Sequence, residues 1–133
     1  MEKKIISTGA LLGMIAIILG AFGAHALKNV LSLEQLSTFE TGVRYQMYHA
    51  LFLLFIGTTN IINQKTKKNI YNLTLIGTIL FSGSIYLLAT NNLTTIDFKI
   101  FGFVTPIGGI LLISAWLKLF FDILIPMKKK TKI

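Results

Sequence analysis

Residues 5–27, IISTGALLGMIAIILGAFGAHAL, decide the fold class of this chain because they contain no charged side chain. Three further stretches share this absence of Asp, Glu, Lys and Arg: residues 45–64, 69–96 and 100–117. Each is long enough to cross a bilayer, whose hydrocarbon core of about 30 Å needs roughly 20 helical residues. Helices are required because backbone groups facing lipid must be hydrogen-bonded within the segment. We therefore predict an all-α membrane four-helix bundle, one domain of residues 1–133 with helices at about 5–26, 45–63, 70–90 and 100–121.

The composition excludes a water-soluble globular protein. The chain is 53% hydrophobic and 14% charged, whereas soluble domains carry about one quarter charged residues. A formal net charge of +8 would suggest nucleic acid in a soluble protein. Here the lysines flank apolar segments, so we expect them to face lipid headgroups, and we expect no nucleic-acid partner. Cysteine is absent, which excludes disulfides and thiolate metal sites.

The distribution of positive charge predicts the topology. Four crossings place nine lysines on one side of the membrane: Lys3, Lys4, Lys65, Lys67, Lys68, Lys128, Lys129, Lys130 and Lys132. The other side receives only Lys28, Arg44 and Lys99, while Lys118 lies near the inner end of the fourth helix. Basic residues are retained on the cytoplasmic side. We therefore predict a multi-pass protein of the inner membrane with both termini in the cytoplasm.

The first helix has two features of its own. Lys3 and Lys4, the apolar run and Ala24-His25-Ala26 resemble a cleavable signal peptide, but the run exceeds the usual core of about 7 to 15 residues, so we expect the helix to be retained. It also carries a stripe of small residues, which would let another helix approach closely. The alternative is that glycine is simply frequent in membrane helices. The stripe comprises Gly9, Gly13, Ala16, Gly20 and Ala24.

The connection after the first helix is expected to hold a short amphipathic helix on the membrane surface. Ser32 and Gln35 are spaced as a capping box. Apolar residues then recur at helical spacing. Gly42 is interpreted as the turn into the second helix. The apolar positions are Leu33, Leu36, Phe39 and Val43.

The second helix opens with the stretch richest in polar groups, residues 40–49. Glu40 and Arg44 are four apart in the order that favours pairing. Because a charge in hydrocarbon costs at least about 2.5 kcal/mol, some of these side chains should point into protein. We predict a polar pocket in the outer half of the bundle, although tyrosines and Arg44 could instead form an interfacial belt. With the histidine of the first helix, the candidate cluster is His25, Glu40, Arg44, Tyr45, Gln46, Tyr48 and His49.

Two histidines at the ends of adjacent helices raise a metal or haem hypothesis, because paired imidazoles are good ligands. Neither His25 nor His49 has a second ligand on its own helix at the spacing of a metal motif, and the chain has five acidic residues in all. A di-iron bundle needs several inward carboxylates. We therefore expect no metal and no cofactor, and a hydrogen-bonded structural histidine.

The last two helices contain groups interpreted as packing devices. Pro106 is expected to kink the fourth helix. Lys118 and Asp122 should pair near the inner boundary, where Trp116 should anchor. No phosphate-binding loop, nucleophile elbow or zinc motif is present, so catalysis has no support. The packing residues are Ser82, Ser84, Pro106, Gly108 and Gly109.

Several of these motifs, in this order, resemble domain-of-unknown-function family 423, also called uncharacterised protein family 0382, which is related to the eukaryotic transmembrane protein 256. The motifs are GAFGAHAL (20–27), YQMYHAL (45–51), FSGSIY (81–86), TPIGG (105–109) and Trp116. The resemblance implies a small four-helix integral membrane protein without an assigned activity. Ala26 and Ala115 replace glycines usual in the family.

Three functional hypotheses follow. The first is a non-enzymatic membrane component that acts through helix contacts with lipid-embedded partners or with a second copy of itself. The second is a transporter or small-molecule binder that uses the polar pocket. The third is metal or haem binding through His25 and His49.

Overall fold

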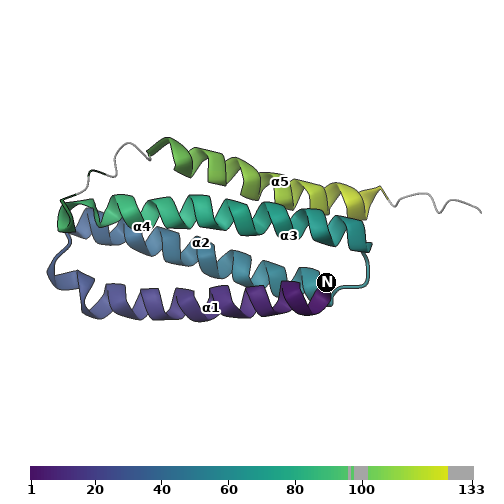
Figure 1. The fold of residues 1–133 in the computed structure, drawn as a ribbon, viewed down its shortest axis with the longest axis horizontal. Helices are drawn as coiled ribbons and strands as arrows, with labels where there is room; N and C mark the ends of the chain where they lie inside the picture. Colours follow the sequence, from purple (N-terminus) through teal and green to yellow (C-terminus); the bar gives the residue numbers. More distant parts are fainter. Residues whose placement is uncertain (96, 98–101, 126–133) are drawn as a thin grey trace, which may run out of the picture.

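Four helical rods lie side by side in the computed structural model, which describes residues 1–95, 97 and 102–125 (Figure 1). Neighbours in sequence run antiparallel, and within the described residues there is no strand. The predicted all-α fold with four long helices is confirmed. The elements are α1 (Glu2–His25), η1 (Leu27–Asn29), α2 (Leu33–Thr58), α3 (Gln64–Thr78), the π-helix η2 (Ile79–Gly83), α4 (Ser84–Ala89), η3 (Asn91–Leu93) and α5 (Val104–Leu124).

Three of the rods are long and apolar enough to cross a membrane. They cover Glu2–Asn29, Gln64–Ala89 and Val104–Leu124, with mean hydropathies of 2.3, 1.6 and 1.9. The second of these joins α3, η2 and α4 into one rod, named here the α3–α4 rod. Helix α2 has 26 residues but is not one of these three apolar rods.

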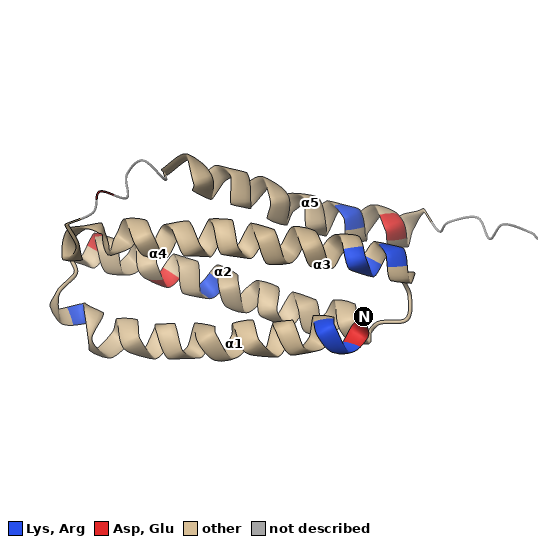
Figure 2. Cartoon of the chain, viewed as in Figure 1, with Lys and Arg blue, Asp and Glu red and all other residues tan. Residues whose placement is uncertain are grey.

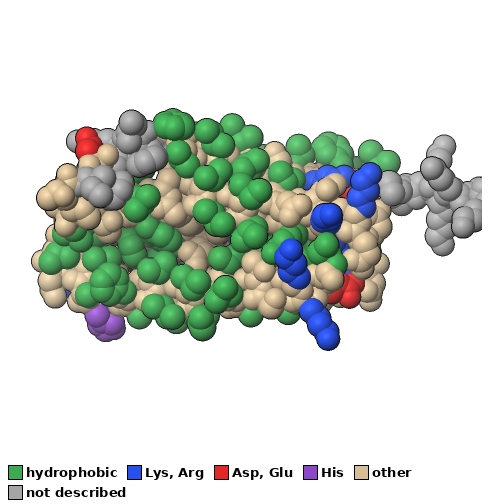
Figure 3. All heavy atoms as spheres, in the orientation of Figure 1, with side chains coloured by type: hydrophobic (Ala, Val, Ile, Leu, Met, Phe, Trp, Pro, Cys, Tyr) green, Lys and Arg blue, Asp and Glu red, His purple; other side chains and the backbone are tan. Residues whose placement is uncertain are grey.

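The charged residues gather towards one end of the bundle. The first residues of α1, the first turns of α3 and the last turns of α5 meet there and carry most of the described lysines (Figure 2). Figure 3 shows hydrophobic side chains over the middle of one face and lysines beyond them. We call this the lysine-rich end. The beginning of α1 and the end of α5 both lie there, as four antiparallel rods require.

Two apolar clusters close the two ends of the bundle. The larger, at the lysine-rich end, contains Ile5, Phe52, Leu53, Ile56, Ile62, Ile70, Tyr71 and Ala115. The smaller, at the opposite end, contains Leu27, Leu31, Phe39 and Ala89. Between these clusters, buried polar side chains are found on α2 and on the α3–α4 rod. The bundle therefore has a polar layer in its middle.

The prediction of a separate amphipathic helix on the membrane surface is wrong. The capping box itself is confirmed: Ser32 Oγ accepts from the Gln35 N–H at 3.1 Å, and Gln35 Oε1 accepts from the Ser32 N–H at 3.0 Å. The helix that starts there continues without a break to Thr58. Gly42 does not form a turn, because it lies within α2. A Cβ atom at this position would lie 2.7 Å from Tyr86 Cε1. Glycine at this position permits close contact between α2 and α4.

Two predicted helix starts are also corrected. The third rod begins six residues earlier than expected, at Gln64, because Asn63 Oδ1 accepts from the Thr66 N–H at 2.8 Å and caps it. The last helix begins at Val104, so Pro106 lies in its first turn. A proline there sacrifices no helical hydrogen bond, since the first N–H groups have no partner within the helix. The predicted kink at Pro106 is therefore wrong.

The small-residue stripe of α1 faces α2 in the same chain. A Cβ atom on Gly9 would lie 2.9 Å from the Ala50 carbonyl oxygen, and one on Gly20 would lie 3.4 Å from Val43. Gly13 has more room, with Ala50 Cβ at 3.7 Å. Ala16 is buried, whereas Ala24 is exposed.

Candidate functional site

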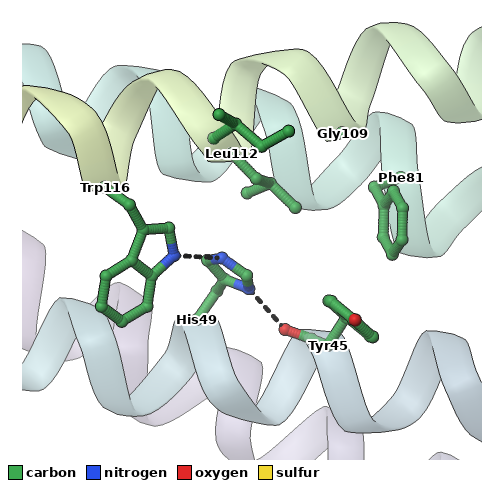
Figure 4. A pocket seen from close by; sticks show the side chains of 7 residues that line it. Tyr45, His49, Phe81, Gly109, Leu112 and Trp116 are labelled. Carbon is green, nitrogen blue, oxygen red and sulfur yellow. Dashed lines mark hydrogen bonds between the residues drawn. The ribbon is translucent and has the colours of Figure 1, made fainter.

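A hydrogen-bonded histidine lies in the middle of α2. His49 is 4% exposed, and its Nδ1 lies 2.7 Å from the Tyr45 carbonyl oxygen. A carbonyl can only accept, so Nδ1 carries the hydrogen. The Trp116 Nε1–H, which can only donate, points at His49 Nε2 at 3.0 Å (Figure 4). The two contacts together define a neutral imidazole with its hydrogen on Nδ1.

Trp116 links α5 to this histidine. Its ring stacks on Phe52, with centroids 4.1 Å apart and an interplanar angle of 20°. The same indole meets the His49 ring edge-on, at 6.0 Å and 78°. The indole is thus engaged by protein side chains, and anchoring of Trp116 at the inner membrane boundary stays a prediction. Its N–H donates to His49 within the protein.

A cavity of about 300 Å³ opens beside this pair, between α2, the α3–α4 rod and α5 (Figure 4). Ile113 is 67% exposed and Tyr45 is 40% exposed, so the cavity communicates with the outside of the bundle. Gly109 leaves the space beside Phe81 open. We call this the His49 cavity; its lining residues are Tyr45, His49, Phe81, Gly109, Leu112, Ile113 and Trp116.

A second buried polar contact lies on another face of α2. Gln46 is 4% exposed; its Nε2 donates to the Leu12 carbonyl oxygen at 2.8 Å, and its Oε1 accepts from the Tyr86 hydroxyl at 2.6 Å. One amide group therefore joins three rods. The Leu12 carbonyl belongs to a continuing helix, so it accepts this bond in addition to its helical one.

The structure divides the predicted polar cluster. Gln46 and His49 are buried, Tyr45 lines the His49 cavity, and Arg44 and Tyr48 are exposed. The part of the cluster between residues 44 and 49 lies near the middle of α2 rather than at the start of a helix. The prediction misplaced it because α2 begins twelve residues before the expected start at residue 45.

The predicted pairing of Glu40 with Arg44 is not found. Arg44 Nη2 donates to Thr41 Oγ1 at 3.1 Å instead. Glu40 is exposed. Within the described part of the chain, the ion pairs are Lys67–Glu2 and Lys118–Asp122, each at 3.0 Å. The second of these confirms the predicted Lys118–Asp122 pair.

His25 and His49 do not meet. Gly23 packs on Phe39, which precedes His49 by ten residues of helix, so roughly 15 Å of bundle length separates the two histidine levels. His25 is exposed. A metal or haem site that uses both histidines of one chain is therefore ruled out by the fold. Among the described residues, no group of three His, Cys, Asp or Glu side chains could hold a metal ion.

The predicted packing residues of the last two rods lie at helix contacts. Ser82 Oγ donates to the Gly42 carbonyl oxygen at 2.7 Å, and the Ser84 hydroxyl bonds to that of Thr105. A Cβ atom on Gly108 would meet the Phe81 backbone, whereas one on Gly109 would lie 3.7 Å from the Phe81 ring. Gly108 thus marks the closest approach of α5 to the α3–α4 rod.

A polar network at the lysine-rich end was missed by the sequence interpretation. Lys67, which was expected to face lipid headgroups, is 1% exposed and pairs with Glu2 of α1. Thr66 donates to Asp122 of α5, and the hydroxyls of Thr8 and Tyr71 bond at 3.0 Å. These partners lie more than fifty residues apart, so no local pattern indicates them.

A family model described as "Protein of unknown function (DUF423)" matches residues 19–109. The chain belongs to this family. The match covers more than half of the chain, and the resemblance noted from the motifs is thereby confirmed.

Curated relatives of this DUF423 chain span nearly its whole length. The UPF0382 membrane protein of Staphylococcus saprophyticus is 48% identical over 120 residues, covering 88% of this chain and 93% of the relative. The UPF0382 membrane protein of Haemophilus influenzae is 36% identical over 119 residues, covering 90% and 92%. No solved structure matches. The DUF423 chain is a membrane protein with helical spans.

Replacing His49 with alanine is expected to change the environment of the single tryptophan. The Trp116 N–H would lose its acceptor, and a hydrogen bond of this kind contributes about 0.5–1.5 kcal/mol. We expect a lower melting temperature and a shift of Trp116 emission to shorter wavelength, measured by fluorescence of the purified protein. His25→Ala is the control, because His25 is exposed. Equal spectra for wild type and His49→Ala would contradict the hydrogen bond.

Proposed function

We propose that the chain crosses the cytoplasmic membrane four times, with both termini in the cytoplasm. Support comes from the length of α2, which at 26 residues matches the other rods. The lysines at one end of the bundle favour that end as the cytoplasmic one. Retention of α1, rather than its removal as a signal peptide, is supported by the burial of Ile5, Gly9 and Ala16.

This topology predicts opposite labelling of two single cysteines in a chain that has none of its own. Ser37 and Asn60 are both exposed and lie at opposite ends of the bundle. In intact cells, Ser37→Cys should react with a membrane-impermeant maleimide, while Asn60→Cys should react only after permeabilisation. The cysteine-free wild type controls for background. Labelling of Asn60→Cys from outside would contradict the topology.

We further propose that the protein is a non-enzymatic membrane component that binds a small molecule from the bilayer in the His49 cavity. The observation that carries this proposal is an open cavity at the level of a buried, fully hydrogen-bonded histidine. Association through the small-residue stripe is less well supported, because Gly9 and Gly20 already contact α2 of the same chain. The lipid bilayer remains the expected partner of the exposed apolar faces.

Native mass spectrometry of the protein extracted in mild detergent tests the binding function. We expect wild type to carry a non-covalent small-molecule adduct. Gly109→Leu should lose it, because the new side chain starts at the cavity wall beside Phe81. Gly83→Leu is the matched control, since a Cβ atom there meets nothing within 4 Å and Gly83 does not line this cavity. Wild type without an adduct would contradict the proposed function.

A further inference from the structure

We infer that the ligand of the His49 cavity is a neutral, flat, conjugated ring that carries a carbonyl oxygen, the chemistry of a quinone or cyclic enone. This inference rests on the proposed binding function and adds the chemical class of the ligand. Four properties of the cavity carry it: its position in the bilayer, the ring side chains of its walls, its lack of charge and one available hydrogen-bond donor.

The position of the cavity argues against an acyl chain. Tyr45, on the cavity wall, lies twelve residues into α2, at a depth of roughly 18 Å from Leu33. In the proposed four-span topology this is the hydrocarbon region. A hydrocarbon ligand gains no hydrophobic free energy there, because lipid tails already solvate it as well as a leucine side chain would. A ligand taken from the bilayer must therefore have groups that lipid tails do not satisfy.

Ring side chains supply one such interaction. Four of the seven lining residues carry rings, contributed by α2, the α3–α4 rod and α5. Trp116 is held in place by its stack on Phe52, and Tyr45 contacts Phe81 with centroids 5.1 Å apart. Aromatic pairs gain about 0.5–1.5 kcal/mol beyond the area they bury. Walls of this kind favour a flat ring over a flexible chain. The four residues are Tyr45, His49, Phe81 and Trp116.

The cavity favours a neutral ligand. No Asp, Glu, Lys or Arg is found among the described residues that line it. His49 is neutral, because its Nε2 accepts from Trp116 while its Nδ1 donates to a carbonyl. An unpaired charge at this depth would cost several kcal/mol. Charged amphiphiles are thereby disfavoured.

One available hydrogen-bond donor, on a residue that lines the cavity, completes the assignment. The only imidazole acceptor, His49 Nε2, is already occupied by the Trp116 N–H. The Tyr45 hydroxyl forms no hydrogen bond with another described residue. A hydroxyl in hydrocarbon without a partner is costly, and so is a carbonyl oxygen. A ligand carbonyl that accepts from Tyr45 would satisfy both groups.

Fluorescence quenching of Trp116, the single tryptophan, tests this inference in lipid nanodiscs. Duroquinone is the probe, and bromodecane and bromomesitylene are a chain quencher and a ring quencher without oxygen. We expect saturable quenching by duroquinone only. Tyr45→Phe should weaken its apparent affinity about fivefold, the size of one net hydrogen bond. Gly109→Leu should weaken it at least about tenfold, while Gly83→Leu should leave it unchanged.

Ile113→Phe provides a second cavity-filling variant should Gly109→Leu fail to fold, because Ile113 lines the cavity and is 67% exposed. Linear duroquinone quenching that is identical in all variants would overturn the inference. Saturable quenching by bromodecane would overturn the inference and favour a chain ligand. Saturable quenching by bromomesitylene would overturn it and favour a ring without oxygen. A native adduct without saturable duroquinone quenching would leave the binding function intact and reject only this ligand class. Absence of both would reject both.

Discussion

Replacing Gly108 with leucine is expected to separate α5 from the bundle. A Cβ atom there would lie 2.8 Å from Phe81 Cα and 2.9 Å from the Gly77 carbonyl oxygen. Both are backbone atoms of the α3–α4 rod, so no side-chain rotation can make room. Overpacking a core with side chains that can adjust costs about 1–3 kcal/mol. At this contact we expect a loss of more than about 3 kcal/mol in the free energy of unfolding, measured by denaturant titration in detergent micelles.

Gly109→Ala is the control for this prediction. The added methyl group would lie 3.7 Å from Phe81 Cδ2, an ordinary contact distance. We expect a change within about 0.5 kcal/mol, because it touches no backbone. Comparing the two variants thus distinguishes the effect of close contact between helices from the effect of replacing a helical glycine in general. Similar stabilities for Gly108→Leu and Gly109→Ala would contradict the observed packing of α5.

Replacing Gln46 with leucine is expected to give the second largest loss of stability. The Tyr86 hydroxyl would lose its acceptor, and the Leu12 carbonyl oxygen would lose its additional donor. We expect a loss of about 2 kcal/mol in the free energy of unfolding, within the range for a buried polar group left without its partner. Thermal unfolding followed by circular dichroism measures it.

A double-mutant cycle provides the control. Tyr86→Phe removes only the hydroxyl and should cost about 1 kcal/mol. The variant with both substitutions should be more stable than the sum of the single losses predicts, because neither group is then left unpaired. Strict additivity would contradict the Gln46–Tyr86 hydrogen bond. Gln35→Leu tests for a general effect of losing a glutamine, since its amide acts only in the cap of α2.

The number and type of the helices could be predicted because bilayer crossing is a local property of the chain. A sufficiently long stretch without charged residues is enough to indicate a span. The Ser32–Gln35 capping box is also local, because its two residues are three positions apart. Helix boundaries were less predictable. The charged residues at the start of α2 were assigned to a separate surface helix, and those at the start of α3 to a loop. In the structure each belongs to a long helix, because neighbouring rods or the outside of the bundle accommodate the charges.

The candidate site was only partly predictable. His49 and Gln46 were identified as polar groups that must find partners, and both are buried. Their partners were not identified. Trp116 is 67 residues from His49, and Tyr86 is 40 residues from Gln46, so no spacing within one helix indicates either contact. The Lys67–Glu2 pair was missed for the same reason, because its two residues are far apart in the sequence.

The sequence by itself determined that this chain is an all-α membrane protein with four long helices, because transfer of apolar segments into lipid depends only on their own composition and length. Only the tertiary structure decided which polar groups share the middle of the bundle, where the His49 cavity opens and which glycines carry contacts. Those outcomes depend on how four rods rotate and slide against each other. That arrangement is a collective result of packing and hydrogen bonding between segments far apart in the chain.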